Sequence, residues 1–403
     1  MGVLAPNGTG LEAFWSTLLE GKSGIGPITL FDATKFKSRI AGEVKDFQPL
    51  DYIGIEQKPK RMARHTQLAY AATMMALKDA GLDIDRLELP SPTPVIVGVS
   101  TSAIDVLERV FRAVEYHGPD HAPPTALASS NPQAAANTIA ERIGVAAHSA
   151  TVSSACPSGL DAVARAADMI RDGEVDVAIA GGADAPITPI TVASFIEGGL
   201  SCASNGDPSR VSRPFDFARK SGVLSEGAAI FVLENLERAE ARGATIAVEI
   251  AGYGMTRDLD PEKPASGLAD SMILALANAG CRLEDIDYIC AYGPSDPLLD
   301  AVEVSLIKRV FGRRAYDIPV SSIKGVTGNP LAAGGPFQLV ACALSIRDQT
   351  IPPTANFEVG DEICDLDFVP FRRRKIKLNH ALINVRGLGG GASTMIVNRV
   401  FAP

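Results

Sequence analysis

The stretch SATVSSACPSGLDAVARAADMI, residues 149–170, places Cys156 between a short β-branched run and a helical pattern. Apolar residues recur after the cysteine at the spacing of one helix face, at Leu160, Val163, Ala164, Ala167 and Ile170. We therefore expect Cys156 at the start of a helix, where unpaired N–H groups and the positive end of the helix dipole stabilise a thiolate. The segment predicts a nucleophilic cysteine with a pKa lowered toward neutrality. An inert buried thiol is the alternative, because free cysteines are often buried.

The composition is that of a globular protein, since 46% of the 403 residues are hydrophobic and 21% are charged. The formal net charge of -9 argues against a general nucleic-acid-binding protein, whose surface would be basic. The six cysteines form no C-x-x-C pair, so neither a zinc site nor a disulfide framework is indicated. The sequence has no long apolar run and no signal-peptide pattern, which predicts a cytoplasmic protein without a membrane span.

Strand-like runs alternate with helical patterns along the chain, for example residues 94–99 before residues 103–114. This alternation predicts an α/β fold with mostly parallel, buried strands. Residues 74–98 and 273–293 also resemble each other, since in both a helix ending in A-L-x-x-A-G leads through an acidic turn into an apolar strand. The similarity favours two duplicated halves joined near residues 234–244. Coincidence is the alternative, because helix endings of this kind are common.

Three segments of the second half run from a predicted strand into an unusual loop, at residues 286–303, 318–337 and 380–400. Loops at the carboxyl ends of parallel strands gather at one crevice, so we expect these loops to converge with the Cys156 loop. The string G-L-G-G-G-A at 387–392 matches a dinucleotide-binding motif, but strand-like residues follow it instead of a helix. A better interpretation is a tight turn whose backbone amides approach a reacting carbonyl.

Motifs spread over nearly the whole chain resemble, in order, those of the β-ketoacyl-ACP synthase family in its elongating, type II form. They are SSACPSGLDAVARAADMI, AIAGGADAPITP, SRPFDFARKSGVLSEGAAIFVLE, SSIKGVTGNPLAAGG, RDQTIPPTANFE, CDLDFVP and the final glycine-rich turn. The resemblance implies a thiolase-like fold, in which two duplicated α/β halves form αβαβα layers. The N-terminal half would span residues 1–239 and hold Cys156, and the C-terminal half, 240–403, would hold the other three loops. The chain starts after the place of the family's first strand, so we expect that strand to be missing.

Both active-site histidines of that family are replaced in this sequence. Tyr292 stands at the first histidine position, within YGPSDP, and Asn329 stands at the second, after K-x-x-T-G. Both side chains donate hydrogen bonds at neutral pH, so they are candidates to polarise a substrate carbonyl. Pro294 and Asp296 replace two threonines that usually touch the pantetheine arm. The chain is therefore identified as an atypical member of the family.

The other site positions that the resemblance implies are mostly retained. Lys324 is present, but Gln338 stands where a glutamate commonly partners this lysine. Leu388, in the glycine-rich turn, replaces the usual gating phenylalanine. The retained supporting carboxylates and turn glycines are Asp300, Glu303, Gly387 and Gly389.

The resemblance implies a thioester mechanism that needs no resident cofactor or metal. Cys156 would accept an acyl group from the phosphopantetheine arm of acyl carrier protein, with the backbone amides of Cys156 and Leu388 as the oxyanion hole. Malonyl-ACP would then lose CO2 and attack that thioester. Lys60 and Arg61 match basic positions that dock the carrier protein in the family. A homodimer is the default arrangement, and a heterodimer with a ketosynthase is the alternative.

Three functions fit the sequence. The first is an acyltransferase that loads Cys156 and condenses or transfers the acyl group in fatty-acid or polyketide-type lipid synthesis. The second is a non-elongating partner subunit, which resembles a chain-length factor in a ketosynthase heterodimer, although such relatives usually lack the cysteine. The third is a carrier-protein-binding module without catalysis. Elongation is the step in question, because loss of one such donor or acid/base costs about 10²–10⁴ in rate.

Overall fold

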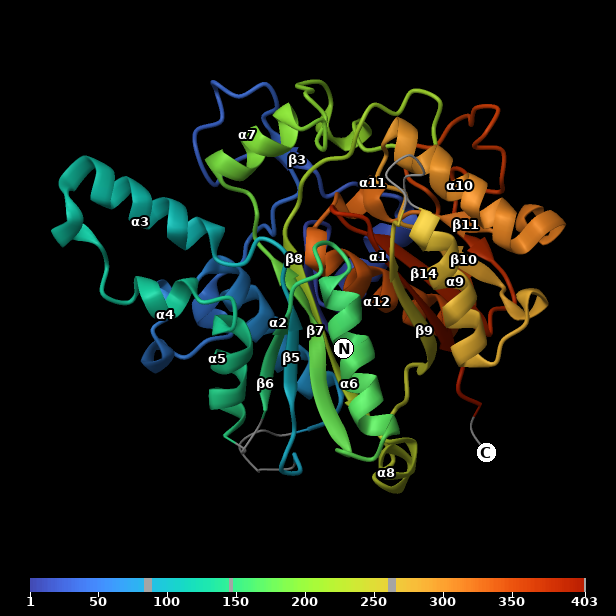
Figure 1. The fold of residues 1–403 in the computed structure, drawn as a ribbon, viewed down its shortest axis with the longest axis horizontal. Helices are drawn as coiled ribbons and strands as arrows, with labels where there is room; N and C mark the ends of the chain where they lie inside the picture. The colour runs from blue at the N-terminus through green and yellow to red at the C-terminus, as the bar shows by residue number, and fades with distance from the viewer. Residues whose placement is uncertain (83–88, 145–147, 260–265, 402–403) are drawn as a thin grey trace.

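The computed structural model describes residues 1–82, 89–144, 148–259 and 266–401, and it contains two main sheets enclosed and separated by helices (Figure 1). The first sheet has six strands in the order β2-β1-β8-β7-β5-β6. Their bounds are β1 Gly2–Ala5, β2 Gly8–Thr9, β5 Val95–Gly98, β6 Ser149–Val152, β7 Val177–Asp184 and β8 Gly227–Glu234.

The second sheet has five strands in the order β11-β10-β14-β15-β9. Their bounds are β9 Glu249–Arg257, β10 Tyr288–Cys290, β11 Val320–Ser321, β14 His380–Arg386 and β15 Gly391–Asn398. Two small two-stranded sheets complete the β-structure. They pair β3 Gly26–Pro27 with β4 Ile40–Ala41, and β12 Thr350–Ile351 with β13 Arg374–Lys375.

The two main sheets repeat one topology. The order β1-β8-β7-β5-β6 in the first matches β9-β15-β14-β10-β11 in the second, strand by strand in sequence order. In each of these five-strand units three neighbouring strands are parallel and the other two add antiparallel pairings, and in the first sheet β2 adds a further antiparallel pairing to β1. The expectation of mostly parallel strands therefore describes only part of each sheet. One reason is local, because the short turn at 387–390 between β14 and β15 can join only antiparallel strands.

The first sheet does contain a strand at the start of the chain, where we expected one to be missing. Residues Gly2–Ala5 form β1, which pairs antiparallel with β8 from Gly2↔Ile230 to Leu4↔Ala228. β1 takes the place in this sheet that β9 takes in the other, over 4 residues instead of 9. A pocket of about 680 Å³ lies beside the rest of β8, lined by residues that include Phe231 and Leu233.

The helices form three layers around the two sheets, which is the αβαβα arrangement that the family resemblance implied (Figure 1). One outer layer covers the first sheet, a central layer lies between the sheets, and another outer layer covers the second sheet. In that order the helices are α2 Arg64–Asp79 and α5 Ala134–Ile143, then α6 Ser158–Arg171 and α12 Gly334–Asp348, then α9 Ser266–Ala279 and α10 Pro297–Phe311.

The central helix α12 is buried from Gly334 to Ile346, as expected for a helix that is apolar on all sides. The two similar sequence segments also take equivalent places. Residues 74–79 end α2 before β5, and residues 273–279 end α9 before β10. The acidic turn of the first segment falls largely on residues 83–88, outside the described part of the chain.

An arm made of α3, Ile104–His117, and α4, Ala126–Ser130, projects from the first half (Figure 1). It exposes large apolar side chains, namely Leu107, Phe111, Tyr116 and Leu127. The other helices are α1 Leu11–Glu20, α7 Pro189–Glu197, α8 Leu236–Ala241 and α11 Lys324–Thr327. Within the described ranges no helix combines the length and the apolar character that crossing a bilayer requires.

Candidate active site

Cys156 lies in the loop between β6 and α6, two residues before the helix begins, and is only 5% exposed. The preceding residue, Ala155, has a φ of 65°, which is unfavourable for a side chain with a Cβ and gives the loop a sharp turn. The turn is held by Ser158, whose hydroxyl accepts the Ser154 N–H at 2.8 Å and donates to the Ala155 carbonyl at 2.5 Å.

The nucleophile loop is also tied to the second sheet. Asp161 on α6 accepts hydrogen bonds from the hydroxyl of Ser154 and, at 2.5 Å, from the hydroxyl of Ser393 on β15. On the other side, a Cβ added to Gly159 would lie 2.2 Å from the Ala332 carbonyl oxygen, so only glycine fits there. Elements of both halves therefore fix the position of Cys156.

The pKa of the Cys156 thiol is raised, which contradicts the expectation of a lowered value. Burial is the main cause, and the negative charge of Asp184 adds to it. The Lys324 cation and hydrogen bonds from the Tyr292 hydroxyl and the Leu388 N–H act in the opposite direction without overcoming burial. The helix start thus supplies the predicted position, while removal of water sets the acidity.

The glycine-rich turn packs directly against the cysteine. A Cβ added to Gly387 would lie 3.1 Å from the Cys156 backbone nitrogen and 2.7 Å from Pro157 Cδ. The turn closes with a 2.8 Å hydrogen bond from the Gly387 N–H to the Gly391 carbonyl, and Gly389 has a φ of 83°. The Leu388 N–H lies near enough to the Cys156 sulfur to act to lower the pKa of the thiol, while the Leu388 side chain is 55% exposed.

Tyr292 follows β10, and its hydroxyl lies near enough to the Cys156 thiol to act to lower the pKa of that thiol. The phenol is buried, and burial together with the nearby cysteine raises the pKa of Tyr292 well above its ordinary value. The hydroxyl therefore remains protonated and available as a donor at neutral pH. The sequence prediction that Tyr292 lies beside Cys156 agrees with this geometry.

Lys324, the first residue of α11, lies against Tyr292. Its Nζ donates to the Tyr292 carbonyl at 2.6 Å and lies 4.3 Å from the centre of the phenol ring. Burial lowers the pKa of Lys324 to about 8, although the negative charge of Glu303 acts to raise it. Gln338 does not take the role of a lysine partner: its amide donates to the carbonyls of Cys290, Ala291 and Asn384, at 3.0, 2.9 and 3.1 Å.

Two buried carboxylates on one face of α10 hold the Tyr292 loop. Glu303 accepts the N–H groups of Tyr292 at 2.9 Å and Gly293 at 2.8 Å. Asp300 accepts the N–H of Phe215 at 2.7 Å and that of Asp296 at 3.2 Å. Burial raises the pKa of Asp300 to about 8 and also raises the pKa of Glu303. Both residues support the loop and do not touch Cys156.

Asn329 follows α11, and its backbone bridges to residues 223–225, through a 2.7 Å bond to the Val223 carbonyl and a 3.0 Å bond from the Ser225 N–H. Its Oδ1 is shielded from solvent and has no hydrogen-bond partner within the described residues. The next element, Leu331–Ala333, packs on α6 beside the nucleophile loop. Asn329 thus borders the site, but its side chain makes no hydrogen bond to Cys156 or Tyr292 in the described structure.

Two charged residues near Cys156 were not among the sequence candidates. Asp184, at the end of β7, is fully buried and accepts the N–H groups of Ser100, Thr101 and Ala332. Burial raises the pKa of Asp184 to about 6. Arg386 ends β14 immediately before the glycine-rich turn. In both cases the available signal was a charged residue closing an otherwise apolar strand.

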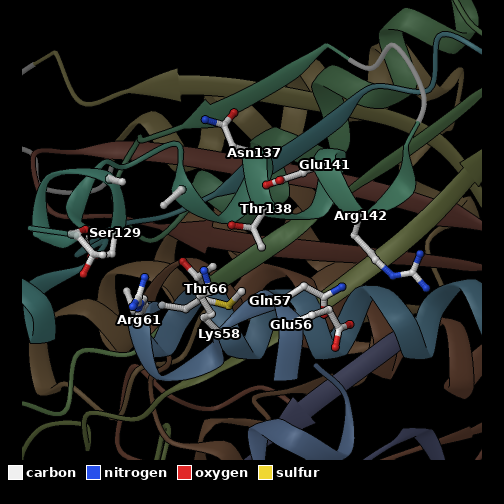
Figure 2. Close-up of a pocket in the computed structure, with 15 residues that line it drawn as sticks. Glu56, Gln57, Lys58, Arg61, Thr66, Ser129, Asn137, Thr138, Glu141 and Arg142 are labelled. Atoms are coloured by element: carbon white, nitrogen blue, oxygen red, sulfur yellow. Dashed lines mark hydrogen bonds between the residues drawn. The ribbon is translucent and has the colours of Figure 1, made fainter. Parts of the chain in front are cut away.

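The predicted docking residues lie apart from this site. Lys60 and Arg61 are exposed at the end of the short helix Pro59–Arg61, and Arg61 lines a pocket of about 680 Å³ (Figure 2). The pocket also presents Lys58 and Arg142, but it carries the carboxylates of Glu56 and Glu141 as well. Arg64, from the same basic run, instead points inward and pairs with Glu226 at 2.6 Å. Neither Cys156 nor Tyr292 lines this pocket.

Comparison with known families decides the identity of this arrangement. The sequence model of the Beta-ketoacyl synthase, N-terminal domain, matches residues 1–239, and that of the Beta-ketoacyl synthase, C-terminal domain, matches residues 247–358. The chain belongs to the β-ketoacyl synthase family.

Individual relatives match over almost the full chain. A 3-oxoacyl-[acyl-carrier-protein] synthase 2 of Coxiella burnetii is 36% identical, covering 100% of this chain and 97% of the relative. A putative polyketide beta-ketoacyl synthase 1 of Streptomyces cyaneus is 39% identical, with 98% and 96% covered. The structure of the ishigamide ketosynthase/chain length factor superposes with a TM-score of 0.92 at 33% identity, covering 99% of this chain and 98% of that chain. The layered fold is thus the thiolase fold of the ketosynthases.

Proposed function

We propose that this protein is a ketosynthase-type acyltransferase that takes an acyl group from acyl carrier protein onto Cys156. The observation that carries the proposal is the environment of the buried Cys156 thiol: the Lys324 cation, the Tyr292 hydroxyl and the Leu388 N–H all act to lower its pKa, and the glycine-rich turn packs against its backbone. A thiol held by such donors beside a buried lysine is equipped for nucleophilic attack, whereas an inert core thiol has apolar neighbours only.

Acyl transfer to the cysteine is a thioester exchange. The sulfur of Cys156 bonds to the carbonyl carbon, the bond from that carbon to the pantetheine sulfur breaks, and the thiol proton passes to the leaving sulfur. The Lys324 cation and the Tyr292 hydroxyl favour the developing thiolate, which offsets part of the effect of burial on its pKa. The backbone N–H groups of Cys156 and Leu388 are the proposed oxyanion hole, because Gly387 brings the turn into contact with the Cys156 backbone.

In the second stage Tyr292 and Asn329 take the places of the family histidines as hydrogen-bond donors to the extender thioester carbonyl. Tyr292 acts as a donor and not as a base, because its pKa is raised well above the ordinary value. The enolate that forms on loss of CO2 is therefore less well stabilised than by two histidines. We infer that the replaced histidines slow the decarboxylative condensation by about 10²–10⁴. Condensation, and not acyl loading, would then limit the overall rate.

Carrier protein and a second subunit are the proposed partners. Lys60 and Arg61 provide exposed positive charge for an acidic carrier protein, on a surface that also presents Glu56 and Glu141. The partner subunit is proposed to pair along β6, an edge strand, and to cover the exposed apolar side chains of the arm. A second copy of this chain is the default partner.

A second function is favoured by the replaced histidines and by the likeness to the ishigamide ketosynthase/chain length factor. In this alternative the chain is the non-elongating subunit of a heterodimer with a ketosynthase. The presence of Cys156 within a hydrogen-bonded site argues for the acyltransferase, since a subunit that only shapes a chamber needs no activated thiol.

Sequential loading separates these functions. The protein is incubated with octanoyl-ACP and then with malonyl-ACP, and intact mass and released products are measured, with Cys156→Ala as the control. If the protein is the acyltransferase, the wild type acquires an octanoyl adduct that Cys156→Ala lacks, and it slowly releases a 3-oxoacyl product. A chain that remains unmodified alone, and supports elongation only when mixed with a ketosynthase, fits the heterodimer subunit.

A further inference from the structure

Arg386, the last residue of β14 before the glycine-rich turn, has an incompletely satisfied guanidinium. Its Nη2 donates to Asp258 Oδ2 at 2.9 Å, and its side chain is 16% exposed. Its Nε is shielded from solvent and has no hydrogen-bond partner within the described residues. A guanidinium presents several N–H donors in one plane and can bind both oxygens of a carboxylate at once. Here Asp258 accepts from Nη2 and leaves Nε unbound.

Asp258 itself is not free to rotate into a better pairing. Its Oδ1 accepts the Gly267 N–H at 2.9 Å, and its own N–H donates to the Gly390 carbonyl at 2.8 Å. Asp258 therefore fixes the guanidinium beside the glycine-rich turn and leaves Nε without an acceptor. A buried donor of this kind costs free energy until a ligand supplies an oxygen.

The guanidinium also lies close to the reacting groups. Arg386 directly precedes Gly387, which packs against the Cys156 backbone, and it lies two residues before Leu388, whose N–H acts to lower the pKa of the Cys156 thiol. Its positive charge acts on the Tyr292 phenol, the side chain that bonds Cys156. A substrate that contacts Tyr292 is therefore within the field of Arg386.

We propose that Arg386 recognises a carboxylate on the substrate, namely the free carboxylate of a malonyl-type extender thioester. This inference rests on the proposed function and adds a residue that selects its substrate. The guanidinium stabilises the bound carboxylate more than the neutral CO2 that leaves it. Arg386 thus favours binding of the extender and slows its decarboxylation. The replacement of the two histidines slows the same step.

The test compares two ligands that differ in charge but hardly in shape. Malonyl-pantetheine and isovaleryl-pantetheine carry a carboxylate and its neutral, branched isostere. Their dissociation constants are measured by calorimetry on the Cys156→Ala protein, which prevents acyl transfer. We expect malonyl-pantetheine to bind about tenfold more tightly, as for a charge-assisted pair. Equal affinities of the two ligands for the Cys156→Ala protein would overturn the inference, even before any Arg386 variant is tested.

Substitutions then assign the preference to the guanidinium. Arg386→Met, added to Cys156→Ala, should abolish the preference for malonyl-pantetheine and leave the affinity for isovaleryl-pantetheine unchanged, which also reports a folded site. Arg386→Lys should keep part of the preference, and Asp258→Asn should keep it. A preference that persists in Arg386→Met contradicts the proposal. Octanoyl loading of the wild type tests the proposed function separately, because octanoate carries no second carboxylate.

Discussion

The proposed acyl transfer depends on the nearness of the Tyr292 hydroxyl to the Cys156 sulfur, where the hydroxyl acts to lower the pKa of the thiol. The Tyr292 hydroxyl, the Leu388 N–H and the Lys324 cation each act to stabilise the thiolate, although burial keeps the pKa of the thiol raised. The Lys324 ammonium donates to the Tyr292 carbonyl and lies over the Tyr292 ring. Cys156, Tyr292 and Lys324 therefore act on one another. A change at any of them should therefore alter the reactivity of the sulfur.

Tyr292→Phe removes the hydroxyl and keeps the ring under Lys324. We expect the rate of octanoyl transfer to Cys156 to fall by about 10², because a positioned donor is lost from the reacting sulfur. Rapid-quench mass spectrometry measures this rate. Tyr316→Phe, at an exposed tyrosine, is the matched control and should load at the wild-type rate. An unchanged rate in Tyr292→Phe would show that the hydroxyl has no part in loading.

Asp184 makes stability depend on pH. Its pKa is raised by burial from 3.8 to about 6, so the folded protein binds the proton more tightly than the unfolded chain. The stabilisation is complete below about pH 4 and is lost as pH rises through about 6, with a loss of about 3 kcal/mol in the free energy of unfolding. Denaturant titrations of the wild type and Asp184→Asn should diverge over this range. Parallel pH profiles would contradict the assignment.

At the scale of elements, the site is built where α6, the Leu331–Ala333 turn and the glycine-rich turn meet. Gly159 and Gly387 permit this approach, since a Cβ on Gly159 would lie 2.2 Å from the Ala332 carbonyl oxygen and one on Gly387 would lie 2.7 Å from Pro157 Cδ. The elements come from both halves of the chain. The site therefore depends on close backbone packing as much as on its reactive side chains.

Gly159→Ala tests this packing. The added methyl meets the Ala332 carbonyl, which is backbone and cannot move aside, so we expect a loss of about 1–3 kcal/mol in the free energy of unfolding and slower acyl loading. Chemical denaturation measures the first effect. Gly206→Ala is the matched control, because a Cβ there meets nothing closer than 3.7 Å. Equal stability of the two variants would contradict the packing account.

Sequence patterns predicted the elements of the site better than its energetics. The spacing of Leu160, Val163 and Ile170 gave the helix after Cys156, and strand-end loops gave the positions of Tyr292 and Lys324. The raised pKa of the cysteine was not predictable in this way, because it depends on how completely three loops distant in sequence exclude water. The partners of Gln338 were not predictable for a similar reason: the carbonyls that it contacts belong to β10, β14 and the loop after β10.

On the scale of the whole molecule, two halves with one topology place their loops at a shared interface. The duplication was only faintly visible in the sequence, at residues 74–98 and 273–293, because strand order survives when side chains diverge. The antiparallel strands and the presence of β1 were missed, since strand direction depends on connections that span long segments, such as residues 185–226 between β7 and β8.

Charge reversal at the proposed docking surface should weaken carrier-protein binding. In Lys60→Glu/Arg61→Glu we expect at least a tenfold rise in the dissociation constant at low salt, and a smaller difference at high salt, because the attraction is between exposed charges. Calorimetry at two ionic strengths measures it. Arg313→Glu, at an exposed arginine of the second half, is the control. Affinity that is equal in all three proteins would place the docking surface elsewhere.

The most direct measurement of the account is the site of acylation after reaction with octanoyl-ACP. The protein is digested under acidic conditions that preserve thioesters, and each of the six cysteines is examined by tandem mass spectrometry. We expect an octanoyl thioester on Cys156, at least tenfold less of it in Tyr292→Phe at early times, and none on the other five cysteines. A protein that stays unmodified with every acyl chain, or that carries the acyl group on another cysteine, would contradict it.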